Sequence, residues 1–286
     1  MYTSKLIQGC MTWGRWGKQL STRQMASQIE DCLSLGVTTF DHADIYGEYT
    51  TEAEFGKAFT ESKIKRESIQ LISKCGLQLP NSTRDNRVKH YQYDSEYIIA
   101  QAEQSISNLN CDYLDAFLLH RPSPLMDLQE IAKSIIYLKE QGKIKHFGVS
   151  NFTTQQIDLL SAHVEVEGHQ LQCSLNHYQP FTNDILQHHS SKQILTMAWS
   201  PLGSLHRLHE DNLSLDKVLG EMAIRYECEK AQLAIAFLNQ HTVGIRPVVG
   251  TTQPKRLKAL KEALTIELSL QDWFLILEAS RGHEVD

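Results

Sequence analysis

The chain has 286 residues, of which 41% are hydrophobic and 22% are charged, and its 34 acidic and 28 basic side chains give a formal net charge of −6. An acidic balance disfavours nucleic acid and anionic membrane surfaces, so we expect neither as a partner. The longest apolar runs, 114–119 and 273–277, are far shorter than the roughly 20 residues of a membrane span. No apolar leader with a basic flank is recognisable, so we expect a soluble, cytoplasmic protein.

Short runs that favour β-structure recur along the whole chain. They lie at residues 5–12, 37–42, 69–75, 113–120, 144–150, 171–176, 194–201 and 246–251. Between them, apolar residues recur with helical spacing. These segments are 22–35, 51–60, 95–108, 126–141, 154–163, 183–190, 215–239 with an interruption near 226, and 254–264. The polar segment 78–94 predicts a long loop between the third strand and its helix.

Helix starts are marked by pairs with the spacing of a capping box, in which an N-cap hydroxyl and a side chain three residues later satisfy backbone amides reciprocally. The pairs are Ser21 with Gln24, Thr51 with Glu54, and Thr153 with Gln156. They place three of the predicted helices independently of the apolar spacing.

Alternation of strand and helix favours a parallel sheet with helical crossovers. Eight such units in a chain of this length fit a closed (β/α)8 TIM barrel, and we expect a single domain over residues 1–286. An open dinucleotide-binding sheet is the main competitor, and it requires a GxGxxG phosphate loop. The chain contains no GxG and no GxxxxGK[ST] loop. Any bound nucleotide must therefore be held in another way.

Candidate functional residues gather where the predicted strands end. In chain order they are Asp41 and Tyr46, Ser73 and Lys74, His120, Ser150 and Asn151, Gln172 and Asn176, Trp199 and Ser200, and Gly250 and Thr251. The chemistry of a TIM barrel lies at the C-terminal ends of its strands, so we expect these residues at one rim. Trp13, Trp16 and Tyr49 are candidates to line the mouth of the site, or else to pack in the core.

Four of these residues suit proton donation to a developing oxyanion. A phenol such as Tyr46 is a poor acid at neutral pH unless a neighbouring cation, here Lys74, stabilises its anion. Asp41 would hold that ammonium by a charge-assisted hydrogen bond, and His120 could orient a carbonyl oxygen. This group contains an acid but no electron source, so a redox cofactor would complete it. No paired cysteine spacing is present among the six cysteines, and we expect reduced thiols and no metal site.

At several positions the chain resembles the aldo-keto reductase family. The motifs that carry the resemblance run from end to end: "GVTTFDHADIYG", "LISKCG", "DYLDAFLLHRP", "KIKHFGVSNF", "LQCSLNHYQP", "MAWSPLG" and "PVVGTTQPKRL". "DHADIYG", "SKCG", "LLHRPSPLMD" and "MAWSPLG" are further similar to the bacterial YdhF-like oxidoreductase subgroup. The resemblance places the catalytic tetrad on Asp41, Tyr46, Lys74 and His120, with Tyr46 as general acid.

The resemblance also implies a bound NADPH. Its nicotinamide carboxamide would contact Ser150, Asn151 and Gln172, and its ring would stack on Trp199. The pyrophosphate would pass Ser200, Leu202 and Ser204, and the 2′-phosphate would lie near Gly250, Thr251 and Arg256. Arg256 matches the phosphate-binding arginine of the family and favours NADPH. Gly250 stands where many members have lysine and Leu260 where a polar residue is frequent, so NADH stays open as cofactor.

The implied reaction is reduction of a small aldehyde or ketone to an alcohol, in a protein we expect to be a monomer. Two alternatives use the same fold. One is an NADPH-binding redox sensor or scaffold with little turnover, like the potassium-channel β subunits that share the fold. The other is a phosphosugar isomerase or aldolase, which would need a Schiff-base lysine or a paired carboxylate base.

Overall fold

Residues 1–82 and 84–285 are described by the computed structural model. Eight parallel strands form a closed barrel in the order β1-β10-β9-β8-β7-β6-β3-β2. Their bounds are β1 Ile7–Gly9, β2 Thr39–Asp41, β3 Gln70–Cys75, β6 Leu114–Leu119, β7 Ile144–Ser150, β8 Gly168–Gln172, β9 Leu195–Trp199 and β10 Arg246–Val249. The predicted (β/α)8 TIM barrel is confirmed.

Helices follow the strands along the chain. They are α1 Thr22–Ser34, α2 Tyr46–Tyr49, α3 Thr51–Ser62, α4 Ser95–Asn108, α5 Leu128–Glu140, α6 Thr154–Ser161, α7 Ile185–Lys192, α8 Leu208–Asp211, α9 Leu213–Arg225, α10 Lys230–Asn239, α11 Pro254–Glu262 and α12 Leu270–Arg281. The chain divides into two compact units, Met1–Gln170 and Leu171–Asp286. A single domain over both units therefore stays a prediction.

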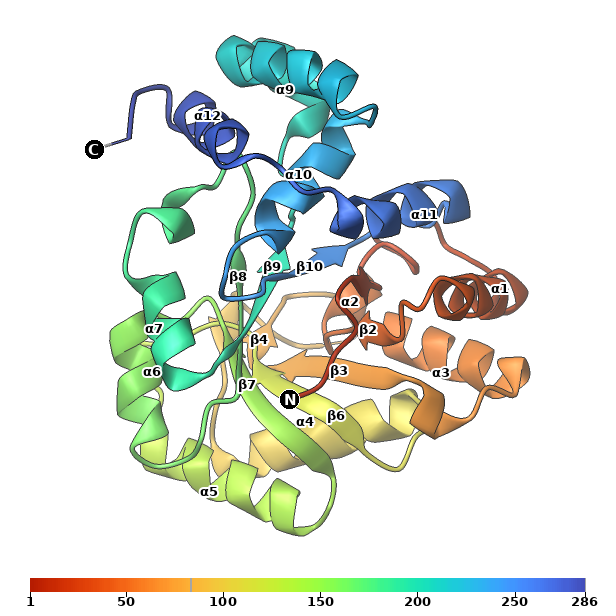
Figure 1. Cartoon of the computed structure of the whole chain (residues 1–286). Coiled ribbons are helices and arrows are strands. Elements are labelled where there is room, and N and C mark those ends of the chain that lie inside the picture. Colours follow the sequence, from red (N-terminus) through yellow and green to blue (C-terminus); the bar gives the residue numbers. More distant parts are fainter. Residues whose placement is uncertain (83, 286) are drawn as a thin grey trace. The chain divides into compact units, whose positions relative to one another are not determined.

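In the first unit, the register of the parallel strands determines how far along the barrel axis each functional residue lies. Asp41 pairs with Ile72, and Lys74 pairs with Leu118 on the other side of β3. Strands β3, β6 and β7 lie side by side, and helices α3, α4 and α5 lie outside them (Figure 1). The core between these layers includes the fully buried rings of Phe40, Phe55 and Phe117. Each such side chain contributes about 1.5–3 kcal/mol by leaving water.

The second unit has its own core, in which Leu219, Phe237 and Ile276 are fully buried. The predicted interruption near residue 226 is confirmed, because α9 ends at Arg225 and α10 begins at Lys230. Helix α12 was not predicted. Its N-cap is Ser269, whose hydroxyl accepts a hydrogen bond from the Asp272 amide, and the stacked rings of Phe237 and Trp273 lie 4.5 Å apart.

Several boundaries differ from the predictions. The sixth strand is Gly168–Gln172 rather than 171–176, so Asn176 lies beyond it. The capping boxes at Ser21 and Thr153 are confirmed. The one at Thr51 is wrong, since Thr51 is already the first helical residue and its neighbour Thr50 makes no side-chain cap.

The polar segment 78–94, predicted as a long loop, contains residues of two short paired strands. It begins in the short strand β4 Leu77–Gln78, which pairs antiparallel with β5 His90–Tyr91. At its C-terminal end, the Asp94 side chain accepts a hydrogen bond from the Tyr97 amide and caps α4. The segment is therefore tied down at both ends.

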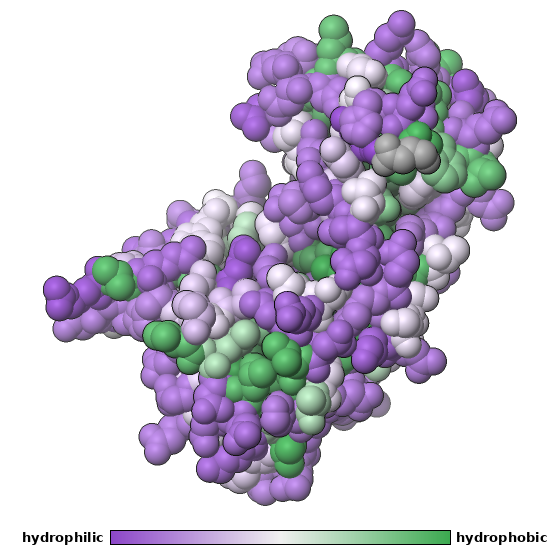
Figure 2. All heavy atoms as spheres, turned by 90° about the vertical axis from the view of Figure 1, so that its left-hand side faces the viewer, coloured by the Kyte–Doolittle hydropathy of each residue, from purple (hydrophilic) through white to green (hydrophobic). Residues whose placement is uncertain are grey.

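The surface drawn in Figure 2 is mostly hydrophilic, with apolar residues in small groups. Among the residues that the structure describes, no helix combines the length and the apolar character needed to cross a bilayer.

Candidate active site

A tight turn after β2 brings Tyr46 back toward the strand. Gly47, Glu48 and Tyr49 all have φ between 60° and 71°. A Cβ at Gly47 would lie 2.3 Å from the Thr51 hydroxyl, so only glycine fits there. This left-handed turn directs the Tyr46 side chain toward the residues at the ends of β2 and β3.

Lys74 is the centre of the site. Its side chain is fully buried, and its ammonium donates to Asp41 Oδ2 at 2.8 Å, to the His42 carbonyl at 2.7 Å and to the Tyr46 hydroxyl at 3.2 Å. An ammonium has three N–H groups, so these acceptors satisfy all of them. Three of the four predicted catalytic residues are thus directly connected.

The pKa shifts in this cluster follow from burial and pairing. Burial by itself lowers the pKa of Lys74, but Asp41 and Tyr46 more than offset it, so the pKa lies above its ordinary value. Burial raises the pKa of Tyr46, and the Lys74 cation offsets only part of this effect. The ammonium is therefore charged and the phenol protonated at neutral pH.

His120 follows β6 and completes the tetrad. Its ring lies edge-on to the Tyr46 ring, with the centroids 6.1 Å apart. Its Nδ1 is buried without a hydrogen-bond partner among the described residues. Burial, followed by the charge of Lys74, lowers the pKa of His120 well below its ordinary value, so the imidazole is neutral.

Ser150 and Asn151 lie at the end of β7, beside His120. The Asn151 amide donates to the Ser150 hydroxyl at 2.7 Å and to the His120 carbonyl at 3.4 Å. Asn151 has a φ of 62°, a conformation that asparagine tolerates better than most residues. Two of the three residues predicted to contact the nicotinamide carboxamide are thus next to the tetrad.

The sequence interpretation missed two residues of the cluster. The Gln170 amide donates to Asp41 Oδ1 at 2.9 Å, so each carboxylate oxygen of Asp41 has a donor. The second is His42, which is fully buried with both ring nitrogens unpartnered among the described residues. Burial and then the charge of Lys74 lower the pKa of His42 to about 3. Gln170 was missed because the sixth strand was expected to begin at residue 171, whereas it begins at Gly168.

Some predicted rim residues lie elsewhere. Ser73 points away from Lys74, and its hydroxyl donates to the buried carboxylate of Glu52 at 2.5 Å. Trp13 is a fully buried core residue, 5.9 Å from the Phe55 ring. Neighbouring residues of a strand face opposite sides, so Ser73 could not share the site with Lys74.

A pocket of about 400 Å³ lies beside the left-handed turn that follows Tyr46, since Glu48 and Tyr49 are among its lining residues. It is lined by Trp16, Glu48, Tyr49, Leu79, Pro80, Asn81 and Ser82. The Trp16 ring lies 6.3 Å from the Tyr46 ring, and Glu48 forms an ion pair with Arg15 at 2.7 Å. Trp16 and Tyr49, two of the candidates for the mouth of the site, both line this pocket.

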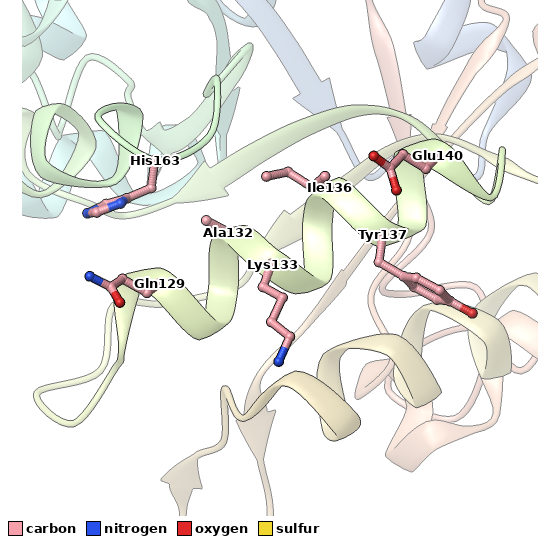
Figure 3. A pocket seen from close by; sticks show the side chains of 7 residues that line it. All are labelled: Gln129, Ala132, Lys133, Ile136, Tyr137, Glu140 and His163. Atoms are coloured by element: carbon pink, nitrogen blue, oxygen red, sulfur yellow. The ribbon is translucent and has the colours of Figure 1, made fainter.

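A second groove, of about 450 Å³, runs along the outer side of α5. Figure 3 shows its side chains strung along the helix, with His163 coming from the segment after α6. None of its seven lining residues belongs to the predicted site.

The second unit holds the remaining predicted cofactor residues. Gln172 ends β8 and Trp199 ends β9, while Ser200 follows with a φ of 50°. Leu202 and Ser204 belong to the same turn, and the Ser204 amide donates to Asn176 Oδ1 at 3.1 Å. Asn176 therefore holds this turn rather than extending a strand.

Gly250, Thr251 and Arg256 follow β10. Arg256 lies exposed in the first turn of α11, and the Thr251 hydroxyl accepts a hydrogen bond from the Gln253 amide at 3.2 Å. Leu260 is 4% exposed and belongs to the core, so it presents no side chain to an adenine at the surface. A guanidinium at a helix N-terminus provides donors suited to a phosphate.

The described cysteines and acidic residues do not form a metal centre. All six cysteines are free thiols. Within the described part of the chain, no group of three or more His, Cys, Asp or Glu side chains is arranged to hold a metal ion.

A barrel with a buried lysine, tyrosine and aspartate near its strand ends is typical of a class of oxidoreductases. Comparison with known proteins identifies the family within that class. The chain belongs to the aldo/keto reductase family, whose sequence pattern it matches over residues 5–281. It is 36% identical to the oxidoreductase YdhF of Escherichia coli, over 99% of this chain and 95% of that one. The oxidoreductase YcsN of Bacillus subtilis is also 36% identical, over 99% and 96%.

A third relative, 33% identical over 99% of this chain and 98% of its own, is the 6-dehydroglucose reductase of Agrobacterium fabrum. Among solved structures, an aldo/keto reductase from Brucella melitensis superimposes with a TM-score of 0.74 at 26% identity, covering 96% of this chain and 94% of that one. The predicted family and the resemblance to YdhF are confirmed. The chain is an oxidoreductase of a family that uses nicotinamide cofactors.

Proposed function

We propose that this enzyme reduces an aldehyde or ketone to an alcohol with NADPH, and that Tyr46 is the general acid. The observation that carries the proposal is the contact of the buried Lys74 ammonium with both Asp41 and the Tyr46 hydroxyl. Few structural roles require an ammonium and a phenol to be buried together beside a neutral imidazole.

The hydrogen bonds determine which proton can move. Because Lys74 donates to the Tyr46 oxygen, the phenolic proton is free to be given to another acceptor. As that proton leaves, the ammonium stabilises the growing phenolate, and Asp41 keeps the ammonium charged. His120, held neutral by burial, orients the substrate carbonyl toward Tyr46.

The residues present fit a nicotinamide cofactor. Ser150 and Asn151 supply hydroxyl and amide groups suited to the nicotinamide carboxamide. Trp199 supplies an aromatic face on which the nicotinamide ring could stack. Ser200, Leu202 and Ser204 belong to a turn whose Gly203 cannot carry a side chain, since a Cβ would meet Asn176 Oδ1 at 2.7 Å. When bound, the reduced cofactor supplies a hydride to the carbonyl carbon. Exposed Arg256 favours NADPH over NADH.

The pocket beside the left-handed turn after Tyr46 supports a neutral, hydroxylated carbonyl substrate. Its polar side chains are Glu48, Asn81 and Ser82, and the one charged residue among them is already paired with Arg15. A phosphate or carboxylate on the substrate would meet no cation among the lining residues, and the two guanidinium groups next to them are already engaged, Arg15 with Glu48 and Arg84 over the Tyr49 ring. Hydroxyl groups, in contrast, find donors and acceptors. The 6-dehydroglucose reductases among the relatives are consistent with a sugar carbonyl.

Replacement of Tyr46 by phenylalanine tests the proposal. Tyr46→Phe should lose nearly all NADPH oxidation on a panel of neutral, anionic and unhydroxylated aldehydes, yet still quench its fluorescence on binding NADPH. Tyr226→Phe is the matched control, because its hydroxyl bonds Asp272 in the second unit. Equal turnover in Tyr46→Phe would refute the acid assignment. NADPH binding by the wild type without turnover would favour the sensor, and a substrate trapped by borohydride would favour the aldolase.

We further propose that both units form one domain, since the family pattern spans residues 5–281 across them. A single cooperative unfolding transition is the expected result, and two separated transitions would contradict it. A monomeric state and a cytoplasmic location stay predictions, the first of which light scattering tests directly.

A further inference from the structure

The backbone around His120 is held by groups outside its own strand. The His120 amide donates to the Cys75 carbonyl at 2.9 Å, and the His120 carbonyl accepts a hydrogen bond from the Asn151 side chain at 3.4 Å. The next residue, Arg121, lies beyond β6, which ends at Leu119. Its backbone is bound by a side chain from the polar segment 78–94, that of Tyr93.

The Tyr93 hydroxyl bonds both polar groups of the Arg121 backbone. It accepts a hydrogen bond from the Arg121 amide at 3.2 Å and donates one to the Arg121 carbonyl. A hydroxyl has one donor and two acceptor sites, so it can make both bonds at once. Tyr93 is 6% exposed, so its hydroxyl is largely shielded from water. A residue held at its amide and at its carbonyl has little freedom to rotate, and this fixes the direction in which the chain leaves His120.

The Tyr93 ring is itself held by the end of β3. Gly76 follows β3 with a φ of 105°, and a Cβ on it would lie 2.0 Å from the Tyr93 ring. Only glycine leaves room for the ring at this position. The Gly76 carbonyl also accepts a hydrogen bond from the Gln92 amide at 2.9 Å, which places Tyr93 beside the strand end. Tyr93 thus connects the end of β3 to Arg121.

The orientation of the His120 ring depends on this backbone. The ring's Nδ1 is buried without a hydrogen-bond partner among the described residues, so no bond at that atom fixes the ring. Catalytic imidazoles are commonly oriented by a hydrogen bond at the nitrogen that does not face the substrate. Without such a bond, the place of the imidazole follows from where the backbone puts its Cα and Cβ atoms.

We propose that Tyr93 is a positioning residue, which fixes the backbone at His120 and Arg121 and thereby orients the His120 imidazole toward the carbonyl oxygen of the substrate. This role rests on the proposed reductase function, in which His120 orients that oxygen. It predicts a loss of turnover without a loss of cofactor affinity, because Ser150 and Asn151 keep their own hydrogen bond.

The first test is Tyr93→Phe, which removes the hydroxyl and leaves the ring against Gly76. A neutral hydrogen bond corresponds to roughly a fivefold change in rate, so we expect kcat per folded molecule to fall about fivefold. The dissociation constant for NADPH, from fluorescence quenching, should change less than about twofold. Tyr226→Phe is the matched control, because the Tyr226 hydroxyl also donates and accepts, to Asp272 and from the Ser269 amide. Its kcat should equal that of the wild type.

A double-mutant cycle tests whether Tyr93 acts through His120. In a His120→Asn background the imidazole is absent, so Tyr93→Phe should change the residual kcat by less than about twofold. A purely structural role would lower kcat by the same factor in both backgrounds. An equal loss in the two backgrounds therefore overturns the role.

Nuclear magnetic resonance of histidine-labelled protein reports on the imidazole without any turnover. The ring resonance of His120 is the one that disappears in His120→Asn. It should move in Tyr93→Phe and stay in place in Tyr226→Phe. Either an unmoved resonance or an unchanged kcat in Tyr93→Phe overturns the role. These failures are distinct from failure of the proposed function, which a wild-type chain without turnover would show.

Discussion

Removing the Lys74 ammonium leaves Asp41 as a buried charge, and the effect on stability is predictable. The two side chains are 0% and 3% exposed. Loss of one partner of a buried pair typically costs about 3–5 kcal/mol, whereas replacing both is often near neutral. Gln170 still donates to Asp41 and offsets part of the loss. We expect Lys74→Met to lower the free energy of unfolding by about 3 kcal/mol.

The companion variant Lys74→Met/Asp41→Asn removes the unpaired charge. It should unfold within about 1 kcal/mol of the wild type in urea at pH 7, followed by tryptophan fluorescence. NADPH oxidation should be lost in both variants, because neither has a cation beside Tyr46. A single variant as stable as the wild type, or a double variant no more stable than the single, would refute the reasoning about the buried pair.

Three further predictions address other parts of the site. The pKa of His42 is about 3 in the folded chain, so below pH 6.5 the unfolded chain binds a proton that the folded chain does not, and stability falls. Between pH 7 and pH 5 this amounts to about 2 kcal/mol; urea unfolding of His42→Leu should show a smaller fall, and an unchanged fall contradicts the assignment. Arg256→Gln should raise KM for NADPH about tenfold and leave KM for NADH unchanged in steady-state assays; equal effects on both would exclude a 2′-phosphate contact. Trp16→Ala should raise KM for hydroxylated aldehydes with little change in kcat, because Trp16 lines the pocket without donating a proton; a loss confined to kcat would contradict this.

The fold could be predicted because most strands are apolar and are separated by helical spacing. The sixth strand was misplaced because its segment "GHQLQ" is polar although it is buried. His169 and Gln170 are 0% and 2% exposed, and each is satisfied by a partner distant in sequence: the His169 ring accepts from the Phe152 amide, and Gln170 donates to Asp41. Apolar periodicity cannot detect a strand whose buried side chains are polar.

Helix α12 was not predicted for the opposite reason. Its residues 273–277 are apolar at consecutive positions, which hides the helical period. Phe274 and Leu275 are 40% and 43% exposed, whereas Ile276 is fully buried. The helix is recognisable from its Ser269 cap, a local signal that does not depend on which apolar residues are buried.

The site shows which of its residues local sequence can reveal. Asp41 ends β2 and Lys74 is the penultimate residue of β3, so their meeting follows from the parallel pairing of these two strands. Nothing in the local sequence indicates Gln170, because its side chain bonds the oxygen of Asp41 that Lys74 does not contact. The two residues come together only when the barrel has formed. A buried ion pair with unsatisfied lone pairs is unfavourable, so the barrel requires a further donor at that position. The hydrogen-bonding needs of the Asp41–Lys74 pair therefore determine that β8 must supply a donor. The sequences of β2 and β8 do not show this when each is considered separately.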